Sequence, residues 1–194
     1  MIARAPRRAL KADGQAPTSL ERNNLITPEG YRKLKRERDD LVKKERPRIV
    51  EEVRQAVLQG DRSENAEYLY GKKRLREIDR RVRFLNKRLD MARVIDPKEQ
   101  NPDCVRFGAT VTVADERGTQ RVYTIVGEDE IDLAARKISW KSPMGAGLLK
   151  AHRGDEIEIE TPRGPILLTL VNYYYGEPHE SSEDPLRHGN VLED

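Results

Sequence analysis

The sequence predicts an α+β fold, in which a long antiparallel α-helical coiled-coil hairpin precedes a small antiparallel β domain with a short helix. Before residue 96, apolar residues recur every three or four positions, which is the spacing of a helix face. After residue 104 they alternate with polar residues in short runs, which is the spacing of strands. The composition agrees, because 37% charged, 36% hydrophobic and 5% aromatic residues are lean for one compact core of 194 residues.

The bulk composition excludes several classes of protein. Cys104 is the single cysteine, so the sequence predicts no internal disulfide and no cysteine-rich zinc site, as expected for a cytoplasmic protein. No stretch is apolar enough for a signal-peptide core or a bilayer span, so we expect no membrane partner. The net charge of +3 conceals opposing blocks, and binding partners must therefore be inferred from local patches.

Both ends of the chain are expected to be disordered. Residues 1–25 mix alanine, proline, glycine and charge without periodicity, and they include basic residues such as Arg7 and Arg8. This composition predicts a basic arm, which is either a solvated tail or a weak nucleic-acid contact, and a solvated tail is the commoner case. Residues 177–194 are acidic and polar and predict a second disordered tail.

Residues 26–96 predict the coiled-coil hairpin. Thr27 and Pro28 form a strong helix start, because the threonine hydroxyl caps the helix and proline lacks an N–H that would have no partner there. Pro47 falls inside the first helix, where we expect a bend rather than a break. The second helix is expected to end at residues 93–96. Its apolar stripe has the most regular spacing in the chain and consists of Leu75, Ile78, Val82, Leu85, Leu89 and Ala92.

The segment Gly60–Tyr70 between the two helices predicts the tip of the hairpin. Gly60 favours the left-handed conformation that closes a helix, and Asp61 or Ser63 can cap the next one. A reversal here makes the helices antiparallel neighbours. At about 1.5 Å of rise per residue, the first helix would hold the tip on the order of 45 to 50 Å from its base. This reach suggests a probe that enters another molecule.

Asp61 and Glu64 give the tip two carboxylates, three residues apart and therefore on one side of a helical turn. They can share a divalent cation or orient a water molecule, but two ligands are too few for a Mg²⁺ site, so a partner would supply the rest. The same pair has the spacing of a capping box, a common stabilising arrangement, and the residues leave both interpretations open.

The second helix carries a strong excess of cations directly behind the tip. Two interpretations remain open. One is contact with an RNA or DNA backbone, with Tyr68 and Tyr70 available for base stacking. The other is a solvated face whose arginines pair with glutamates of the first helix. The candidate nucleic-acid-binding residues are Lys72, Lys73, Arg74, Arg76, Arg80, Arg81 and Arg83.

Residues 97–104 predict a linker, because their prolines disfavour helix in the residues before them. The C-terminal domain, residues 105–176, predicts a sheet with turns at 115–118 and 162–164 and a short helix at 144–149. Strands are expected at 109–114, 119–126, 137–140 and 165–175, and around Ile157 and Ile159.

Ser142, Pro143 and Met144 precede two further glycines and predict a flexible loop in this domain. The loop is either a contact surface or only a turn. Residue types alone favour the turn, because glycine and proline are turn formers first.

Several segments carry a resemblance to a known family. They are Leu25–Tyr31, Gly60–Tyr68, Lys72–Arg83, Phe107–Ala109, Ile125–Gly127 and Ser142–Met144. Over about residues 25–175 the chain resembles the bacterial transcript-cleavage factors of the Gre family, and within that family the GreB branch. The resemblance implies an N-terminal coiled coil and a C-terminal domain of the FKBP-like fold, in a protein that we expect to be monomeric.

The resemblance also implies a function. The C-terminal domain would dock at the rim of the secondary channel of bacterial RNA polymerase, and the coiled coil would enter the channel. Asp61 and Glu64 would help to hold the second Mg²⁺ of the polymerase active site and position a water that cuts backtracked nascent RNA. The polymerase would supply the catalytic metal and most of its ligands. The chain is therefore expected to be an accessory factor rather than an enzyme.

Two further sites follow from the resemblance. The cations between Lys72 and Arg83 would guide the extruded 3′ end of the RNA, and Ser142, Pro143 and Met144 would contact the polymerase rim. The sequence departs from the family pattern beside the second site. Lys141 stands where an acidic residue is expected, and residues 145–147 lack the arginine that usually follows the methionine. These departures predict altered or weaker docking.

Two alternatives belong to other functional classes. The chain would be a channel-occupying regulator without cleavage activity if the tip carboxylates had no chemical role, and the presence of both Asp61 and Glu64 counts against this. An FKBP-like domain can also be a prolyl isomerase, but residues 105–176 contain few aromatic residues to line such a pocket.

Overall fold

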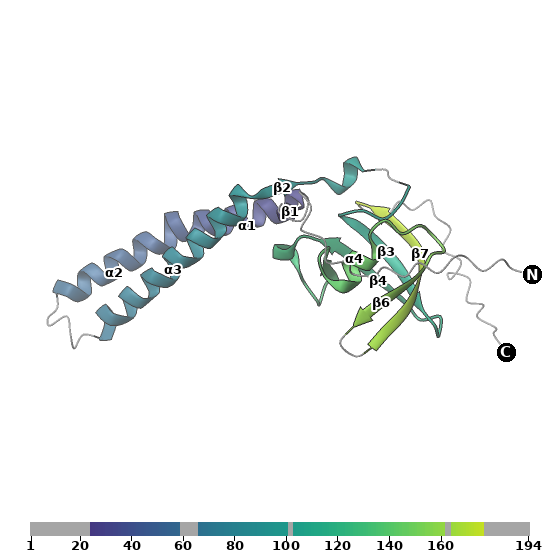
Figure 1. Ribbon diagram of the computed structural model, residues 1–194. Helices are drawn as coiled ribbons and strands as arrows, with labels where there is room; N and C mark the ends of the chain where they lie inside the picture. The colour runs from purple at the N-terminus through teal and green to yellow at the C-terminus, as the bar shows by residue number, and fades with distance from the viewer. Residues whose placement is uncertain (1–23, 59–65, 101–102, 162–163, 177–194) are drawn as a thin grey trace, which may run out of the picture.

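The computed structural model describes residues 24–58, 66–100, 103–161 and 164–176, and the fold is mixed α+β. A long N-terminal helical region extends away from a curled β-sheet (Figure 1). The predicted basic N-terminal segment and acidic C-terminal tail lie outside the described residues, except for Asn24 and Leu25, where the prediction is corrected. Asn24 and Leu25, which we assigned to the arm, form strand β1 (Asn24–Ile26) and are buried. No described helix is both long enough and apolar enough to cross a membrane.

The helical arm consists of α1 (Pro28–Asp40), the π-helical turn η1 (Leu41–Glu45), α2 (Arg46–Leu58) and α3 (Ala66–Asp90). Its start is as predicted, because the Thr27 hydroxyl accepts a hydrogen bond from the Gly30 N–H at 3.1 Å. The first helix runs through Pro47 without a break, as predicted. The irregularity is the π turn immediately before it, in which the Arg46 N–H bonds to the carbonyl of Leu41, five residues earlier.

The two halves of the arm pack against each other in opposite directions. On α3, the centre of the interface between the two halves consists of buried side chains of the predicted stripe, namely Ile78, Leu85 and Leu89. Leu34 on α1 joins Leu85 and Leu89 in one cluster near the base of the arm. Farther out, Gly71 lies so close to Val53 that a Cβ atom on the glycine would be 2.4 Å from Val53 Cγ2.

The second helix ends earlier than predicted. We expected its end at residues 93–96, but α3 ends at Asp90 and Ala92–Val94 form strand β2, which pairs in parallel with β1. The reason is tertiary, because the backbone of β1 supplies partners that a helix would not use. The Ile95 N–H donates to the Ile26 carbonyl at 2.9 Å, and the Asn24 N–H donates to the Met91 carbonyl at 3.2 Å.

The C-terminal part is a five-stranded sheet with the strand order β5-β4-β3-β7-β6. All neighbouring strands are antiparallel except β4 and β5, which are parallel. The strands and turn predicted here are confirmed to within one or two residues, apart from Pro162 and Arg163, which lie outside the described residues. The strands are β3 (Ala109–Asp115), β4 (Gln120–Val126), β5 (Lys137–Ser139), β6 (Glu156–Thr161) and β7 (Gly164–Tyr175).

Three short helices complete the fold: the 3₁₀ turns η2 (Pro97–Glu99) and η3 (Glu128–Glu130), and α4 (Pro143–Leu148). The core of the sheet contains Val111, Ile125 and Leu170, all with 0% exposure, and α4 contributes Leu148 to the same cluster. At the base of the arm, η3 contacts β1 through the hydrogen bond from the Asn24 side chain to Asp129.

The close approach of Gly71 to Val53 predicts a measurable packing defect. Gly71→Ala should destabilise the protein by about 1 to 2 kcal/mol, because overpacking outweighs the better helix propensity of alanine. Chemical denaturation checks this. Adding Val53→Ala should recover part of the loss, since it removes the clashing methyl groups. A Gly71→Ala protein as stable as the wild type would contradict the packing described here.

Candidate functional site

The two carboxylates predicted at the tip, Asp61 and Glu64, fall outside the described residues. The structure places the neighbouring ends, Leu58 of α2 and Ala66 of α3, at the far end of the arm from the sheet (Figure 1). Within the described ranges, no group of three or more histidine, cysteine, aspartate or glutamate side chains is arranged to hold a metal ion. Metal binding by Asp61 and Glu64 stays a prediction, and two carboxylates suit a hard cation only as a partial ligand set.

The structure divides the basic segment of α3 into two faces. One face carries arginines seven residues apart, and it points toward acidic groups. Arg74 lies 2.5 Å from Glu45 and also contacts Glu77 at 3.2 Å. Arg81 makes two hydrogen bonds to Glu37, at 2.6 and 2.9 Å. Hydrogen bonds to these glutamates raise the pKa values of Arg74 and Arg81. Pairing with the first helix is therefore confirmed for two of the candidate residues.

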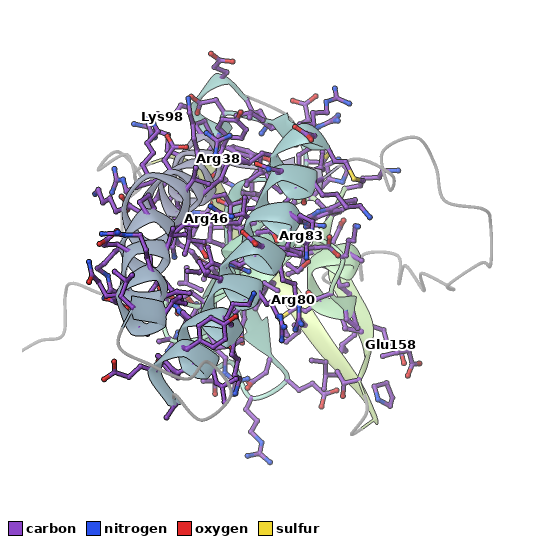
Figure 2. The ribbon with its side chains drawn as sticks, turned by 90° about the vertical axis from the view of Figure 1, so that its left-hand side faces the viewer. Arg38, Arg46, Arg80, Arg83, Lys98 and Glu158 are labelled. Atoms are coloured by element: carbon purple, nitrogen blue, oxygen red, sulfur yellow. The ribbon has the colours of Figure 1, made fainter. Side chains whose placement is uncertain are left out.

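The other face of α3 is a row of cations that points to solvent. In Figure 2, Arg80 and Arg83 lie on the side of α3 away from α1 and α2. From Lys73 onward, successive members are three or four residues apart and so share one side of the helix, and Lys72 lies next to Lys73. None makes an ion pair with another described residue, and Lys72 lies with its Nζ atom 5.8 Å from the centre of the Tyr68 ring. This outer row consists of Lys72, Lys73, Arg76, Arg80, Arg83 and Lys87, all exposed.

The outer row has the chemistry of a nucleic-acid contact. Closely spaced guanidinium and ammonium groups attract phosphates by releasing counterions, and arginine can bind a phosphate through two donors. Tyr70 is 69% exposed close to the tip end of this row and is available for stacking on a base. Nucleic-acid contact thus stays a prediction for the outer row, while Arg74 and Arg81 follow the pairing interpretation.

The predicted loop at Ser142, Pro143 and Met144 is a helix start. The Ser142 hydroxyl accepts from the Gly145 N–H at 3.0 Å and donates to the Ser139 carbonyl at 2.6 Å. Gly145 has no room for a side chain, because a Cβ atom would be 2.1 Å from the Ser139 oxygen. The expectation of a flexible loop is therefore corrected, while Pro143 is exposed at the surface.

Lys141 has a structural partner that sequence reasoning missed. Its Nζ atom lies 3.2 Å from Glu128 of η3 and 5.3 Å from the centre of the Trp140 ring. Glu128 also contacts Arg88 at 3.1 Å. Although burial alone would raise it, hydrogen bonds from these two cations lower the pKa of Glu128. The departure from the expected acidic residue at 141 is thus accommodated by an ion pair at the base of the arm.

Arg88 is the third arginine of the paired face, and it binds the domain instead of the first helix. Its guanidinium donates to Asp129 at 2.7 Å and to the side-chain oxygen of Asn24 at 2.6 Å. Asn24 in turn donates to Asp129 at 3.0 Å. The seven-residue spacing from Arg81 could have marked Arg88 as part of the same row. Its partners, however, are 41 and 64 residues away in the sequence.

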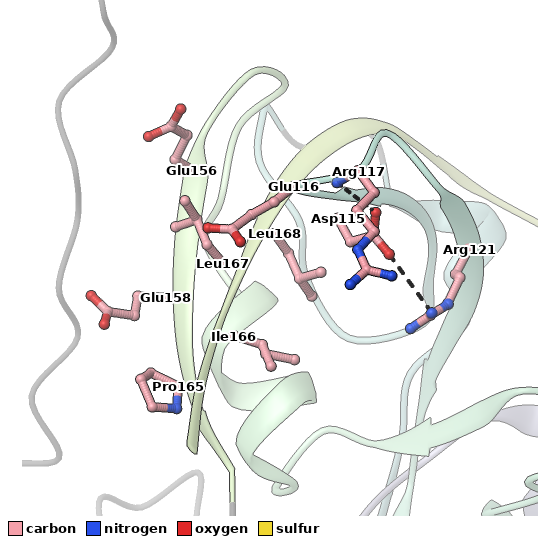
Figure 3. A pocket seen from close by; sticks show the side chains of 10 residues that line it. All are labelled: Asp115, Glu116, Arg117, Arg121, Glu156, Glu158, Pro165, Ile166, Leu167 and Leu168. Atoms are coloured by element: carbon pink, nitrogen blue, oxygen red, sulfur yellow. Dashed lines mark hydrogen bonds and ion pairs between the residues drawn. The ribbon is translucent and has the colours of Figure 1, made fainter. Parts of the chain in front are cut away.

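A groove of about 520 Å³ lies between the β3–β4 turn and strands β6 and β7 (Figure 3). Asp115 organises its rim by accepting from the Arg117 N–H at 3.0 Å and lying 3.7 Å from Arg121. None of the residues that line it is aromatic, so this groove gives no support to a prolyl isomerase. The lining residues are Asp115, Glu116, Arg117, Arg121, Glu156, Glu158, Pro165, Ile166, Leu167 and Leu168.

Comparisons with known proteins cover both parts of the chain. The family model described as "Transcription elongation factor, N-terminal" matches residues 24–94, and the one described as "Transcription elongation factor, GreA/GreB, C-term" matches residues 99–175. Curated relatives match most of the chain. Transcription elongation factor GreB of Neisseria meningitidis serogroup B is 51% identical over 158 residues, which are 81% of this chain and 97% of that protein.

Two further proteins illustrate the range of similarity. GreB of Yersinia pestis is 45% identical over 156 residues, which are 80% of this chain and 91% of that protein. Among solved structures, GreA factor homolog 1 of Thermus thermophilus matches 79% of this chain and 99% of its own. It is 22% identical to this chain, with a TM-score of 0.37.

Proposed function

Because the chain belongs to the GreA/GreB family of transcription elongation factors, we propose that it acts on bacterial RNA polymerase and stimulates cleavage of backtracked nascent RNA. The observation that supports this most is the arrangement of the arm. An exposed row of cations leads along α3 toward a tip whose sequence contains two carboxylates. Such an arm can bring cations to the RNA and carboxylates to a metal ion, both deep within the polymerase.

In this proposal the helical arm is a coiled coil that enters the secondary channel of the polymerase. The C-terminal domain, which we assign to the FKBP-like class, docks at the channel rim through the start of α4, with the exposed Pro143 and the half-buried Ser142 and Met144. The arm extends from the domain as a slender pair of helices, as insertion requires (Figure 1). The tip then lies deep in the channel, far from the docking surface.

Asp61 and Glu64 are the residues that would reach the polymerase active site. They would hold a second Mg²⁺ together with ligands of the polymerase, and that ion, when bound, would activate a water and stabilise the leaving oxygen. Asp61 and Glu64 would bind the ion and orient the water, while the polymerase would carry out the hydrolysis. The protein is thus an accessory factor in this proposal and not an enzyme by itself.

The outer row of cations would hold the extruded 3′ segment of the RNA. Its side chains are exposed and lie on one side of α3, so several phosphates can be contacted at once. Arg74 and Arg81 are assigned a different role, because their guanidinium groups already bind Glu45 and Glu37. They hold the two halves of the arm together.

The alternative function is a regulator that occupies the channel without stimulating cleavage. A protein of that class would need the arm and the docking surface but no acidic pair at the tip. Asp61 and Glu64 therefore favour the cleavage factor.

Asp61→Asn should reduce stimulated cleavage of RNA in stalled elongation complexes by at least about tenfold, which corresponds to about 1.4 kcal/mol of lost transition-state stabilisation. The free energy of unfolding of the variant should be nearly that of the wild type, because asparagine caps a helix about as well as aspartate. Gel analysis of the shortened transcripts measures the effect. Equal stimulated cleavage with the wild type and with Asp61→Asn would refute the proposed role of Asp61.

Removing two cations of the outer row should weaken the RNA contact selectively. The Arg80→Gln, Arg83→Gln double variant should reduce the salt dependence of stimulated cleavage, by roughly 0.7 in the log–log slope for each lost phosphate contact. Cleavage rates over a range of salt concentrations check this.

The matched control for this double variant is Arg32→Gln with Arg36→Gln, which removes the same charge from exposed positions on α1. The control should keep the wild-type slope. If both double variants lowered the slope equally, general charge rather than the outer row would be responsible.

A further inference from the structure

Two segments that resemble the family have no part in the proposed chemistry, and the structure brings them together at the base of the arm. The segment Leu25–Tyr31 contains the start of α1, and the segment Ile125–Gly127 leads into η3 of the domain. Their meeting point is the carboxylate of Glu130, the last residue of η3.

Glu130 completes the N-terminal cap of a helix that belongs to the arm. One carboxylate oxygen accepts from the Thr27 N–H at 3.0 Å and from the Gly127 N–H at 3.1 Å. The other oxygen accepts from the Thr27 hydroxyl, while that hydroxyl itself accepts from the Gly30 N–H. The negative charge also lies at the N-terminal end of α1, where the helix dipole favours it. A residue of the domain thus performs a role usually filled by the helix's own residues.

Glycines on two sides let the backbone approach this carboxylate closely. A Cβ atom on Gly30 would be 2.3 Å from the Glu130 carboxyl carbon, and one on Gly127 would be 2.4 Å from the Leu25 carbonyl oxygen. Both glycines are buried. The carboxylate therefore lies between closely spaced backbone atoms of the arm and the domain, while Leu25 of β1 packs into the core of the sheet.

A fixed base matters because the arm is long. The residues from Pro28 to Leu58 span about 45 Å at about 1.5 Å of rise per residue, so a rotation of about 5° at the base moves the far end by about 4 Å. Catalytic groups tolerate far less, since a misplacement of about 1 Å can cost about a hundredfold in rate.

We propose that Glu130 is a positioning residue, which sets the direction of the arm by capping α1 from the domain and so aims the tip at the active site of the polymerase. This inference rests on the proposed function. Arg88 and Asp129 support the same junction from α3, and Lys137 of β5 lies 3.8 Å from Glu29 of α1, but the cap by Glu130 is the hydrogen-bonded contact to the first helix.

The direction of the arm can be measured by pulsed electron paramagnetic resonance with full-length protein. Spin labels are attached at Val50→Cys on α2 and Arg117→Cys in the β3–β4 turn, in a Cys104→Ser background. Glu130→Ala should broaden the distribution of distances between the labels. Glu158→Gln, a change at an exposed glutamate of β6, should leave it narrow.

Cleavage assays at saturating factor provide the second readout. Glu130→Ala should lower the maximal rate of stimulated cleavage at least about tenfold, with a smaller change in the half-saturating concentration. Glu158→Gln should keep both values. If Glu130→Ala does not fold, Gly30→Ala serves instead, because its new methyl group displaces the same carboxylate.

An unchanged distance distribution would overturn the proposal, and so would a broadened distribution with an unchanged cleavage rate. The distance measurement does not depend on cleavage. Failure of the proposed function, seen as full cleavage with Asp61→Asn, is therefore distinguishable from failure of the positioning role.

Discussion

The function proposed for this chain depends on how the arm is joined to the domain. The junction is polar: Glu130 caps α1, Arg88 of α3 binds Asp129, and β1 pairs with β2 between them. Such contacts have fixed directions, unlike apolar packing, which tolerates sliding. Leu25 of β1, with 6% exposure, adds an apolar contact by packing into the core of the sheet. Because the arm is long, directional contacts at its junction are needed to hold its far end at a defined place relative to the domain.

The same segment of α3 both holds the arm together and carries its charge. Arg74, Arg81 and Arg88 are seven residues apart and all have carboxylate partners, in the first helix or in η3. The cations between them face solvent. Exposed ion pairs of this kind contribute little stability individually, so the apolar stripe around Ile78 and Leu85 supplies most of it. The paired arginines mainly neutralise acidic groups of the first helix, which leaves the outer row as the net positive face.

Local and periodic features were predictable from the sequence, and distant contacts were not. Leu85 and Leu89 repeat at helical spacing, and Thr27 with Pro28 has the chemistry of a helix start, so the arm could be predicted. Strand β2 could not, because its pairing partner is β1, 68 residues earlier, where Asn24 faces Ala92. The cap by Glu130 spans 103 residues and has no local signal. The cations of α3 were predicted as one group, and only their packing separated the paired face from the outer row.

In the proposed function, Asp61 and Glu64 supply ligands to a metal ion that the polymerase holds. A Mg²⁺ titration of stimulated cleavage with wild type and Glu64→Gln tests it most directly, because removing a ligand weakens binding of the ion without removing the arm. The Glu64→Gln variant should need a higher Mg²⁺ concentration for half-maximal cleavage, and added Mg²⁺ should restore part of the lost rate. An identical Mg²⁺ dependence for the two proteins would contradict it.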